Sequence, residues 1–125
     1  MPDITDVGQI ALTVRDLERA TAFYRDVMGL PLLFEASGMA FFQCGSTRLL
    51  LGTADLSEGE HPPTILYYRV DDIEASCAAL RDRGAALERD PALAHRAEDH
   101  ELWLAFLRDP DGHMLALMSE VPTSG

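Results

Sequence analysis

Two stretches of the sequence repeat one pattern and decide the fold: IALTVRDLE at residues 10–18 and ILYYRVDDIE at residues 65–74. An offset of 56 residues places Asp16 on Asp72, with a valine two positions before and a glutamate two positions after each aspartate. Alternating side chains before each aspartate are typical of a strand. An aspartate at such a place can accept the free N–H groups of a helix's first turn. The sequence therefore predicts a strand followed by an aspartate-capped helix, twice.

Each predicted helix has an apolar stripe at three- and four-residue spacing and a glycine at its end. The first helix is expected to bury Leu17, Ala20, Tyr24, Val27 and Met28 and to end at Gly29. The second is expected to bury Ile73, Cys77 and Leu80 and to end at Gly84.

Three short strands are expected after each helix, separated by turn residues. The expected strands are 30–35, 39–43 and 48–52 in the first copy, and 86–88, 101–108 and 113–119 in the second. The unit is therefore βαβββ, present twice within a single domain of the α+β class that covers residues 1–125. We expect the first module at about 7–52, a polar linker at 53–63 and the second module at about 64–119. Residues 89–100 are expected to form a long loop.

Charge and composition exclude several classes of function. The chain has 125 residues and a formal net charge of −11 at pH 7, so nucleic acid and anionic membrane surfaces are not expected as partners. No apolar run is long enough to span a bilayer, and acidic residues stand where a secretory signal would be basic. Cys44 and Cys77 are far apart and lack a metal or redox spacing, so reduced thiols are expected. These features predict a cytoplasmic protein.

Three motifs in this frame resemble the glyoxalase/bleomycin resistance/dioxygenase superfamily, also called the vicinal oxygen chelate superfamily. They are VRDL at 14–17, AFYRDVMGL at 22–30 and DPDG at 109–112. The resemblance covers nearly the whole chain. It implies that the paired modules form a half-open mixed β barrel with the helices outside and a pocket on the concave face. It also implies a homodimer.

Enzymes of this superfamily usually hold a divalent metal with side chains from the first and last strands of each module. The resemblance carries these places over to Gln9, Leu50, Ile65 and Ala116, with one residue of uncertainty at Leu50. Only Gln9 offers a donor atom, which is too little for a divalent ion. We therefore expect no metal, no cofactor and no catalytic residue of the usual kind. His95, His100 and His113 fit no zinc spacing and are expected to be solvated.

The alternation of side chains along strands extends this pocket to further residues. The ligand-binding pocket is expected to be lined by Gln9, Thr13, Arg48, Leu50, Ile65, Tyr67, Arg69, Trp103, Met114, Ala116 and Met118. Their alternates, such as Leu12 and Leu117, are expected to pack under the helices. If Arg48 and Arg69 point inward, the pocket favours a carboxylate or phosphate; if they point outward, the acidic surface favours a cationic guest.

These observations predict a metal-free protein that binds a small organic molecule, with sequestration of a drug or metabolite as its expected role. A lyase, isomerase or dioxygenase with an atypical metal site is the alternative. A third possibility is an interaction domain whose pocket has collapsed.

Overall fold

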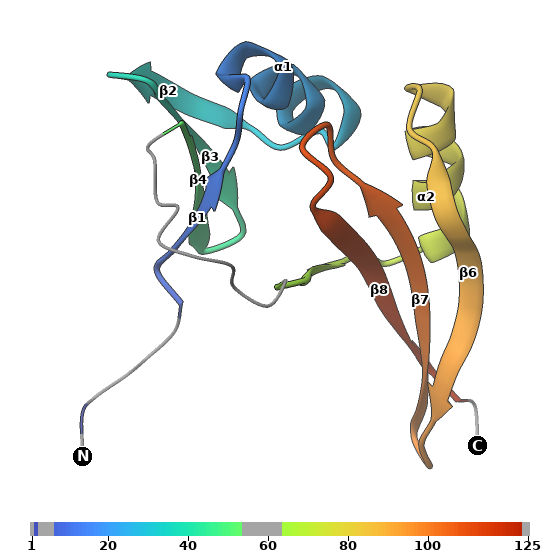
Figure 1. Ribbon diagram of the computed structural model, residues 1–125. Helices are drawn as coiled ribbons and strands as arrows, with labels where there is room; N and C mark the ends of the chain where they lie inside the picture. The colour runs from blue at the N-terminus through green and yellow to red at the C-terminus, as the bar shows by residue number, and fades with distance from the viewer. Residues whose placement is uncertain (1, 3–6, 54–63, 124–125) are drawn as a thin grey trace. The chain divides into compact units, whose positions relative to one another are not determined.

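The computed structural model describes residues 2, 7–53 and 64–123 and divides the chain into two units, Met1–Glu60 and His61–Gly125 (Figure 1). All of the expected linker except Thr53 lies outside the described residues. No helix in the described part of the chain is long and apolar enough to cross a membrane.

The first unit is a four-stranded mixed sheet with one helical segment. Its elements are β1 (Gln9–Thr13), α1 (Leu17–Ala22), the π-helical segment η1 (Phe23–Val27), β2 (Leu32–Ala36), β3 (Met39–Cys44) and β4 (Thr47–Gly52). The strands lie in the order β1-β4-β3-β2, with β1 and β4 parallel and the other neighbours antiparallel.

The second unit repeats this topology, as Figure 1 shows by the same succession of strand, helix and three strands. Its elements are β5 (Leu66–Arg69), α2 (Ile73–Asp82), β6 (Leu87–Arg96), β7 (His100–Arg108) and β8 (Met114–Pro122). The strand order is β5-β8-β7-β6, again with only the first pair parallel. The prediction of an α+β fold with two βαβββ copies is confirmed.

Both helices begin as the repeat predicts. The carboxylate of Asp16 accepts a hydrogen bond from the Arg19 amide at 3.1 Å, and that of Asp72 accepts one from the Ala75 amide at 3.0 Å. The two aspartates have nearly identical backbone angles, with φ of −126° and −125°. Each helical segment is followed by a glycine with positive φ, a conformation that glycine adopts without steric cost.

The first helix contains a feature that its sequence pattern does not reveal. Residues 23–27 are π-helical, and the amide of Met28 donates to the carbonyl of Phe23, five residues earlier. A π turn holds one more residue than an α turn. Tyr24 nevertheless remains fully buried, so the wider turn keeps the aromatic side chain in the core.

The expected loop at residues 89–100 is wrong: β6 extends through Arg96, and only 97–99 form the turn before β7. The ladder between β6 and β7 has three register shifts, one of them spanning Pro91. Each shift turns successive side chains away from strict alternation. The sequence of a bulged strand therefore looks like a loop.

One face of each sheet forms the core against its own helix. In the first unit this face carries Ala40, Phe42, Leu49 and Leu51, which are buried with Ala20 and Tyr24 of the helical segment. In the second unit it carries Ala105, Leu107, Leu115 and Leu117, which are buried with Ile73, Cys77 and Leu80. The other face of each sheet, which we call the open face, is not covered by a helix of its own unit.

Candidate binding faces

The open face of the first sheet carries four of the predicted site residues. Gln9 and Arg48 are register partners in the β1–β4 ladder, and Ala11 lies opposite Leu50. Leu49 and Leu51 are 2% and 0% exposed because they point toward the helix, whereas Leu50 is half-buried on the opposite face. Leu50 is thus the residue that shares a face with Gln9, which removes the one-residue uncertainty. Thr13 ends β1 on this face and is exposed.

The open face of the second sheet carries the equivalent residues. Tyr67 lies opposite Ala116, and Arg69 lies opposite Met118. Met114 begins β8 on the same face, and Ile65 directly precedes β5. Tyr67 is 50% exposed, whereas Ala116 is 0% exposed although it faces the same way. The small alanine is covered by its larger neighbours on adjacent strands.

The residues that the resemblance assigns to the metal positions do not fit a metal. The structure places Gln9 and Leu50 on one open face and Ala116 on the other, with Ile65 at its margin. Leucine, isoleucine and alanine side chains have no lone pair to donate, and a single amide oxygen does not replace the water shell of a divalent ion. No group of three His, Cys, Asp or Glu residues in the described ranges is arranged to hold a metal elsewhere.

An aromatic ring lies beside two of these three apolar residues. Phe41 lies directly opposite Leu50 in the β3–β4 ladder, and Phe106 lies directly opposite Ala116 in the β7–β8 ladder. In the first unit the ring of Phe41 also stacks on Phe34, with centroids 4.4 Å apart. Each open face therefore presents an apolar and aromatic surface where a metal-dependent relative would place a donor.

An arginine lies over each of these rings. The guanidinium carbon of Arg48 is 5.8 Å from the centroid of Phe41, and that of Arg89 is 6.0 Å from the centroid of Phe106. Both distances are within the range of cation–π attraction. Sequence reasoning missed Phe41, Phe106 and Arg89. The two phenylalanines alternate with the buried Phe42 and Leu107, and this alternation was the signal that could have found them.

Two of the residues predicted to line the pocket, Ile65 and Met114, line one cavity of the second unit. A cavity of about 300 Å³ is lined by Ile65, Glu88, Arg89, Phe106 and Met114. Its walls combine three apolar side chains with one cation and one anion. This is the mixture of apolar surface and few polar groups that is typical of small-molecule sites, at the lower end of their size range.

Trp103 does not join these residues, which corrects its place among the predicted pocket residues. It lies opposite Ser119, which is buried on the helix side of the sheet. There it lines a different cavity, beside the first turn of α2, and its indole N–H donates to Glu101 at 3.3 Å. Trp103 and Phe106 therefore lie on opposite faces of the sheet, because they are an odd number of residues apart in β7.

The charged groups of the open faces differ in their partners. Arg69 forms an ion pair with Glu120 at 3.1 Å, so part of its charge is already neutralised. Within the described residues, Arg48 and Arg89 form no ion pair. They are therefore the arginines of these faces whose charge remains available to a ligand.

The three histidines considered above lie at separate places in the second unit. His100 Nδ1 lies 2.7 Å from the carboxylate of Asp99, and this hydrogen bond lowers the pKa of Asp99. The backbone amide of His113 donates to the buried carboxylate of Asp109 at 2.8 Å, which braces the DPDG turn. His95 is exposed on β6. The histidines of the described residues do not converge on a common point.

Comparison with known proteins places this chain in a family. Residues 6–117 match the model of the Glyoxalase/Bleomycin resistance protein/Dioxygenase superfamily, and the chain belongs to that superfamily. The fold and the strand positions described above are thus those of a group whose members bind small molecules.

Its relatives carry the names of more than one enzyme. A probable lactoylglutathione lyase from Vibrio cholerae is 31% identical over 121 residues, which cover 86% of this chain and 85% of that protein. A catechol-2,3-dioxygenase from Bacillus subtilis is 30% identical over 126 residues, which cover 96% of this chain but 43% of that protein. The crystal structure of a lactoylglutathione lyase from Agrobacterium tumefaciens has a TM-score of 0.74 at 25% identity, covering 94% of this chain and 96% of that one.

Proposed function

We propose that this protein binds a small organic molecule on its open faces without the divalent metal used by enzymes of its superfamily. The observation that carries this proposal is the chemistry at Leu50, Ile65 and Ala116. Two of these apolar residues lie directly opposite a phenylalanine in their ladders. An apolar, aromatic surface gains free energy from covering another ring or hydrocarbon, and it offers no lone pair to replace the water ligands of a divalent ion.

The ligand that best matches these faces is an aromatic or apolar molecule with a carboxylate. Arg48 and Arg89 supply a guanidinium next to each ring, and neither forms an ion pair among the described residues. A guanidinium a few ångströms from a ligand outweighs distant surface carboxylates, because salt screens charges beyond about 8–10 Å. The net charge of −11 therefore does not decide the charge of this ligand.

Sequestration is the role that follows from binding without a metal, and the cytoplasm is its expected compartment. Cys44 and Cys77 are both free thiols, as is usual in reducing surroundings. A lyase or dioxygenase with an atypical metal site is the second candidate. The names of the relatives from Vibrio cholerae and Bacillus subtilis favour it.

One set of measurements separates the two candidates. Protein purified without an affinity tag is analysed for bound elements, and native mass spectrometry detects any retained organic molecule. If the protein binds its ligand without a metal, the molar ratio of metal to protein should be far below one. The protein should also show no lactoylglutathione lyase activity after zinc, nickel or cobalt is added. One tightly bound metal ion per chain together with metal-dependent activity would establish the enzyme instead.

The charge preference is tested with a matched pair of probes, phenylacetate and 2-phenylethylammonium. We expect phenylacetate to shift the NMR signals of Phe41 and Phe106, and Arg48→Gln and Arg89→Gln to weaken its binding by at least about threefold each. Arg25→Gln is the control, because Arg25 is paired with Asp26 on the helical segment. Stronger binding of the ammonium probe at these phenylalanines would reverse the assigned charge.

A further inference from the structure

A further hollow lies on the helix side of the first sheet, between α1 and the hairpin of β2 and β3. It has a volume of about 560 Å³, and it is lined by Leu17, Glu18 and Thr21 of α1 and by residues 35–39 of the hairpin. Glu35 lies opposite the fully buried Ala40, which faces the helix, so the hollow is on the helix side of the sheet. It is therefore separate from the open face to which the proposed function belongs.

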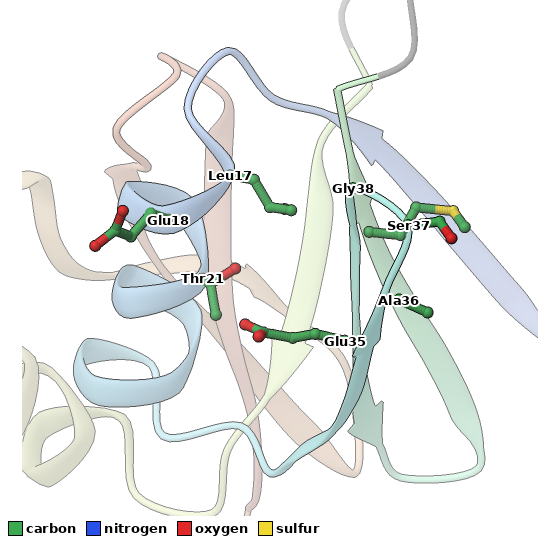
Figure 2. Close-up of a pocket in the computed structure, with 8 residues that line it drawn as sticks. Leu17, Glu18, Thr21, Glu35, Ala36, Ser37 and Gly38 are labelled. Carbon is green, nitrogen blue, oxygen red and sulfur yellow. The ribbon is translucent and has the colours of Figure 1, made fainter.

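Figure 2 shows how the side chains meet in this hollow. Leu17 and Thr21 point from the helix toward the hairpin, and the side chain of Glu35 runs from β2 back toward Thr21. The carboxylate of Glu18 points away from the hairpin, so Glu18 belongs to the rim. One carboxylate, one hydroxyl and one leucine thus come together from two elements.

The hydroxyl of Thr21 is a buried polar group without a hydrogen-bond partner among the described residues. Thr21 is 3% exposed, and its Oγ1 has no hydrogen-bond partner among the described residues. A buried polar group without a partner destabilises the fold, and such groups are uncommon in folded proteins. A ligand that offers an N–H or O–H donor at this point would remove that cost.

The second copy of the repeat shows that the fold does not require this hydroxyl. The offset of 56 residues places Cys77 where the first copy has Thr21, and Cys77 is fully buried in the core. The same topology is thus built with a weakly polar side chain at this position. The hydroxyl of Thr21 is therefore not needed to build the fold.

The carboxylate of Glu35 is available for an ion pair. No cation of the described residues lies within salt-bridge distance of it. The pKa of Arg25 is raised chiefly by its hydrogen bond to Asp26, and the charge of Glu35 contributes least. The guanidinium of Arg25 is thus held by another carboxylate.

The wall opposite the helix is a tight turn. Ser37 and Gly38 have φ of 47° and 77°, and Ala36 pairs with Met39 on either side of them. Two successive residues with positive φ are the mark of a type I′ hairpin turn, which fixes the backbone closely. The hollow is therefore formed before any ligand arrives.

We propose that this hollow binds the ammonium group of a small organic amine. The carboxylate of Glu35 accepts one N–H of the ammonium in a charge-assisted hydrogen bond, and the hydroxyl of Thr21 accepts another after a small rotation of its side chain. The hydrocarbon part of the amine covers Leu17 on the helix side of the sheet. This site differs in place and in ligand charge from the one proposed above, and neither depends on the other.

The test uses hexylammonium, with 1-hexanol as its neutral counterpart and hexanoate as its anionic one. Each is titrated into the full chain and followed by the amide NMR signals of Thr21, Glu35 and Gly38. We expect saturable shifts with hexylammonium and at least about tenfold weaker binding of the other two, as a charge-assisted hydrogen bond implies. Equal binding of hexanol and hexylammonium, or equal shifts with calcium ions, would overturn the proposal.

Two variants and one control locate the contacts. Glu35→Gln should weaken hexylammonium binding about tenfold. Thr21→Val keeps the shape of the side chain, so it should raise the melting temperature of the free protein and still weaken binding severalfold. Glu98→Gln makes the same change of charge on the second unit and should change nothing. If Thr21→Val raises the melting temperature but leaves binding intact, or if Glu35→Gln binds like the parent, the assigned contacts are wrong.

Discussion

Phe106 lies directly across from Ala116 in the β7–β8 ladder, in the same relation that Phe41 has to Leu50 in the β3–β4 ladder. Both copies of the repeat thus have an aromatic side chain next to a position that offers no metal donor. Rings and small apolar residues on adjacent strands form a continuous surface. This pairing makes the open faces suited to covering an organic molecule.

Phe41 and Phe42 are neighbours in sequence but should respond differently to truncation. Phe42→Ala is expected to lower the free energy of unfolding by about 3–5 kcal/mol, because Phe42 is fully buried under the helical segment. Phe41→Ala removes a half-buried ring from the open face and is expected to cost roughly half as much or less, with loss of phenylacetate binding. Urea denaturation and NMR titration measure the two effects. Equal losses of stability would contradict the facing of β3.

The two aspartate caps provide a matched pair of variants. Asp16→Ala and Asp72→Ala should each lower the free energy of unfolding by about 1 kcal/mol, since each carboxylate caps its helix with one amide hydrogen bond. Asp→Asn at either place keeps an acceptor oxygen and should cost less. Denaturation of the four variants tests this. If only one of the two alanine variants loses stability, the two caps do not contribute equally to the free energy of unfolding.

The thiol of Cys77 should make stability depend on alkaline pH. Burial raises the pKa of Cys77 above its ordinary value of 9.0. As the pH rises past 9, the unfolded chain loses this proton before the folded chain does, so the free energy of unfolding falls. Denaturation at pH 7 and pH 9.5 should show this decrease, and Cys77→Ala should reduce it. Cys77 should also react with a thiol reagent only when the protein unfolds, because it is fully buried.

We expect a symmetric homodimer. Strands β1 and β5 are outer strands of their sheets in the described structure, and Leu33, Phe34 and Tyr67 are large apolar residues left exposed on it. Unpaired strand edges and exposed apolar side chains are commonly covered by a second copy of the chain. Light scattering should give twice the mass of one chain at micromolar concentration. A monomer at that concentration would contradict the expectation.

The amide protons of β6 should exchange unevenly. β6 is an outer strand with three register shifts in its pairing with β7. Amides that donate to β7 should be protected, whereas those at the shifts and those facing outward should exchange rapidly. Hydrogen exchange measured residue by residue over 87–96 would test this. Uniformly rapid exchange would favour the loop that the sequence suggested.

The parts of the fold predicted correctly from the sequence depend on local patterns. Asp16 and Asp72 mark the helix starts because a cap is decided by a few neighbouring residues. Leu117 is buried as expected, since the side chains of a regular strand alternate. The duplicated motif supplied the order of elements.

The parts that were missed depend on contacts between distant segments. The extent of β6 is fixed by its pairing with β7, and its bulges hide the alternation that would reveal a strand. The facing of Trp103 follows from its pairing with Ser119 across a turn. The role of Thr21 depends on the hairpin opposite it, which a helical stripe does not show.

The difference in length between the two copies has an evolutionary consequence. The caps repeat after 56 residues, but the register pairs Ala11 with Leu50 and Tyr67 with Ala116, so the final strands repeat after 66. Most of this difference lies in the hairpins, while the helical segments differ by one residue, because Gly29 and Gly84 are 55 residues apart. The two sheets have thus tolerated changes in hairpin length. The β6–β7 tip at 97–99 is accordingly a natural place to insert a peptide or a fluorescent reporter.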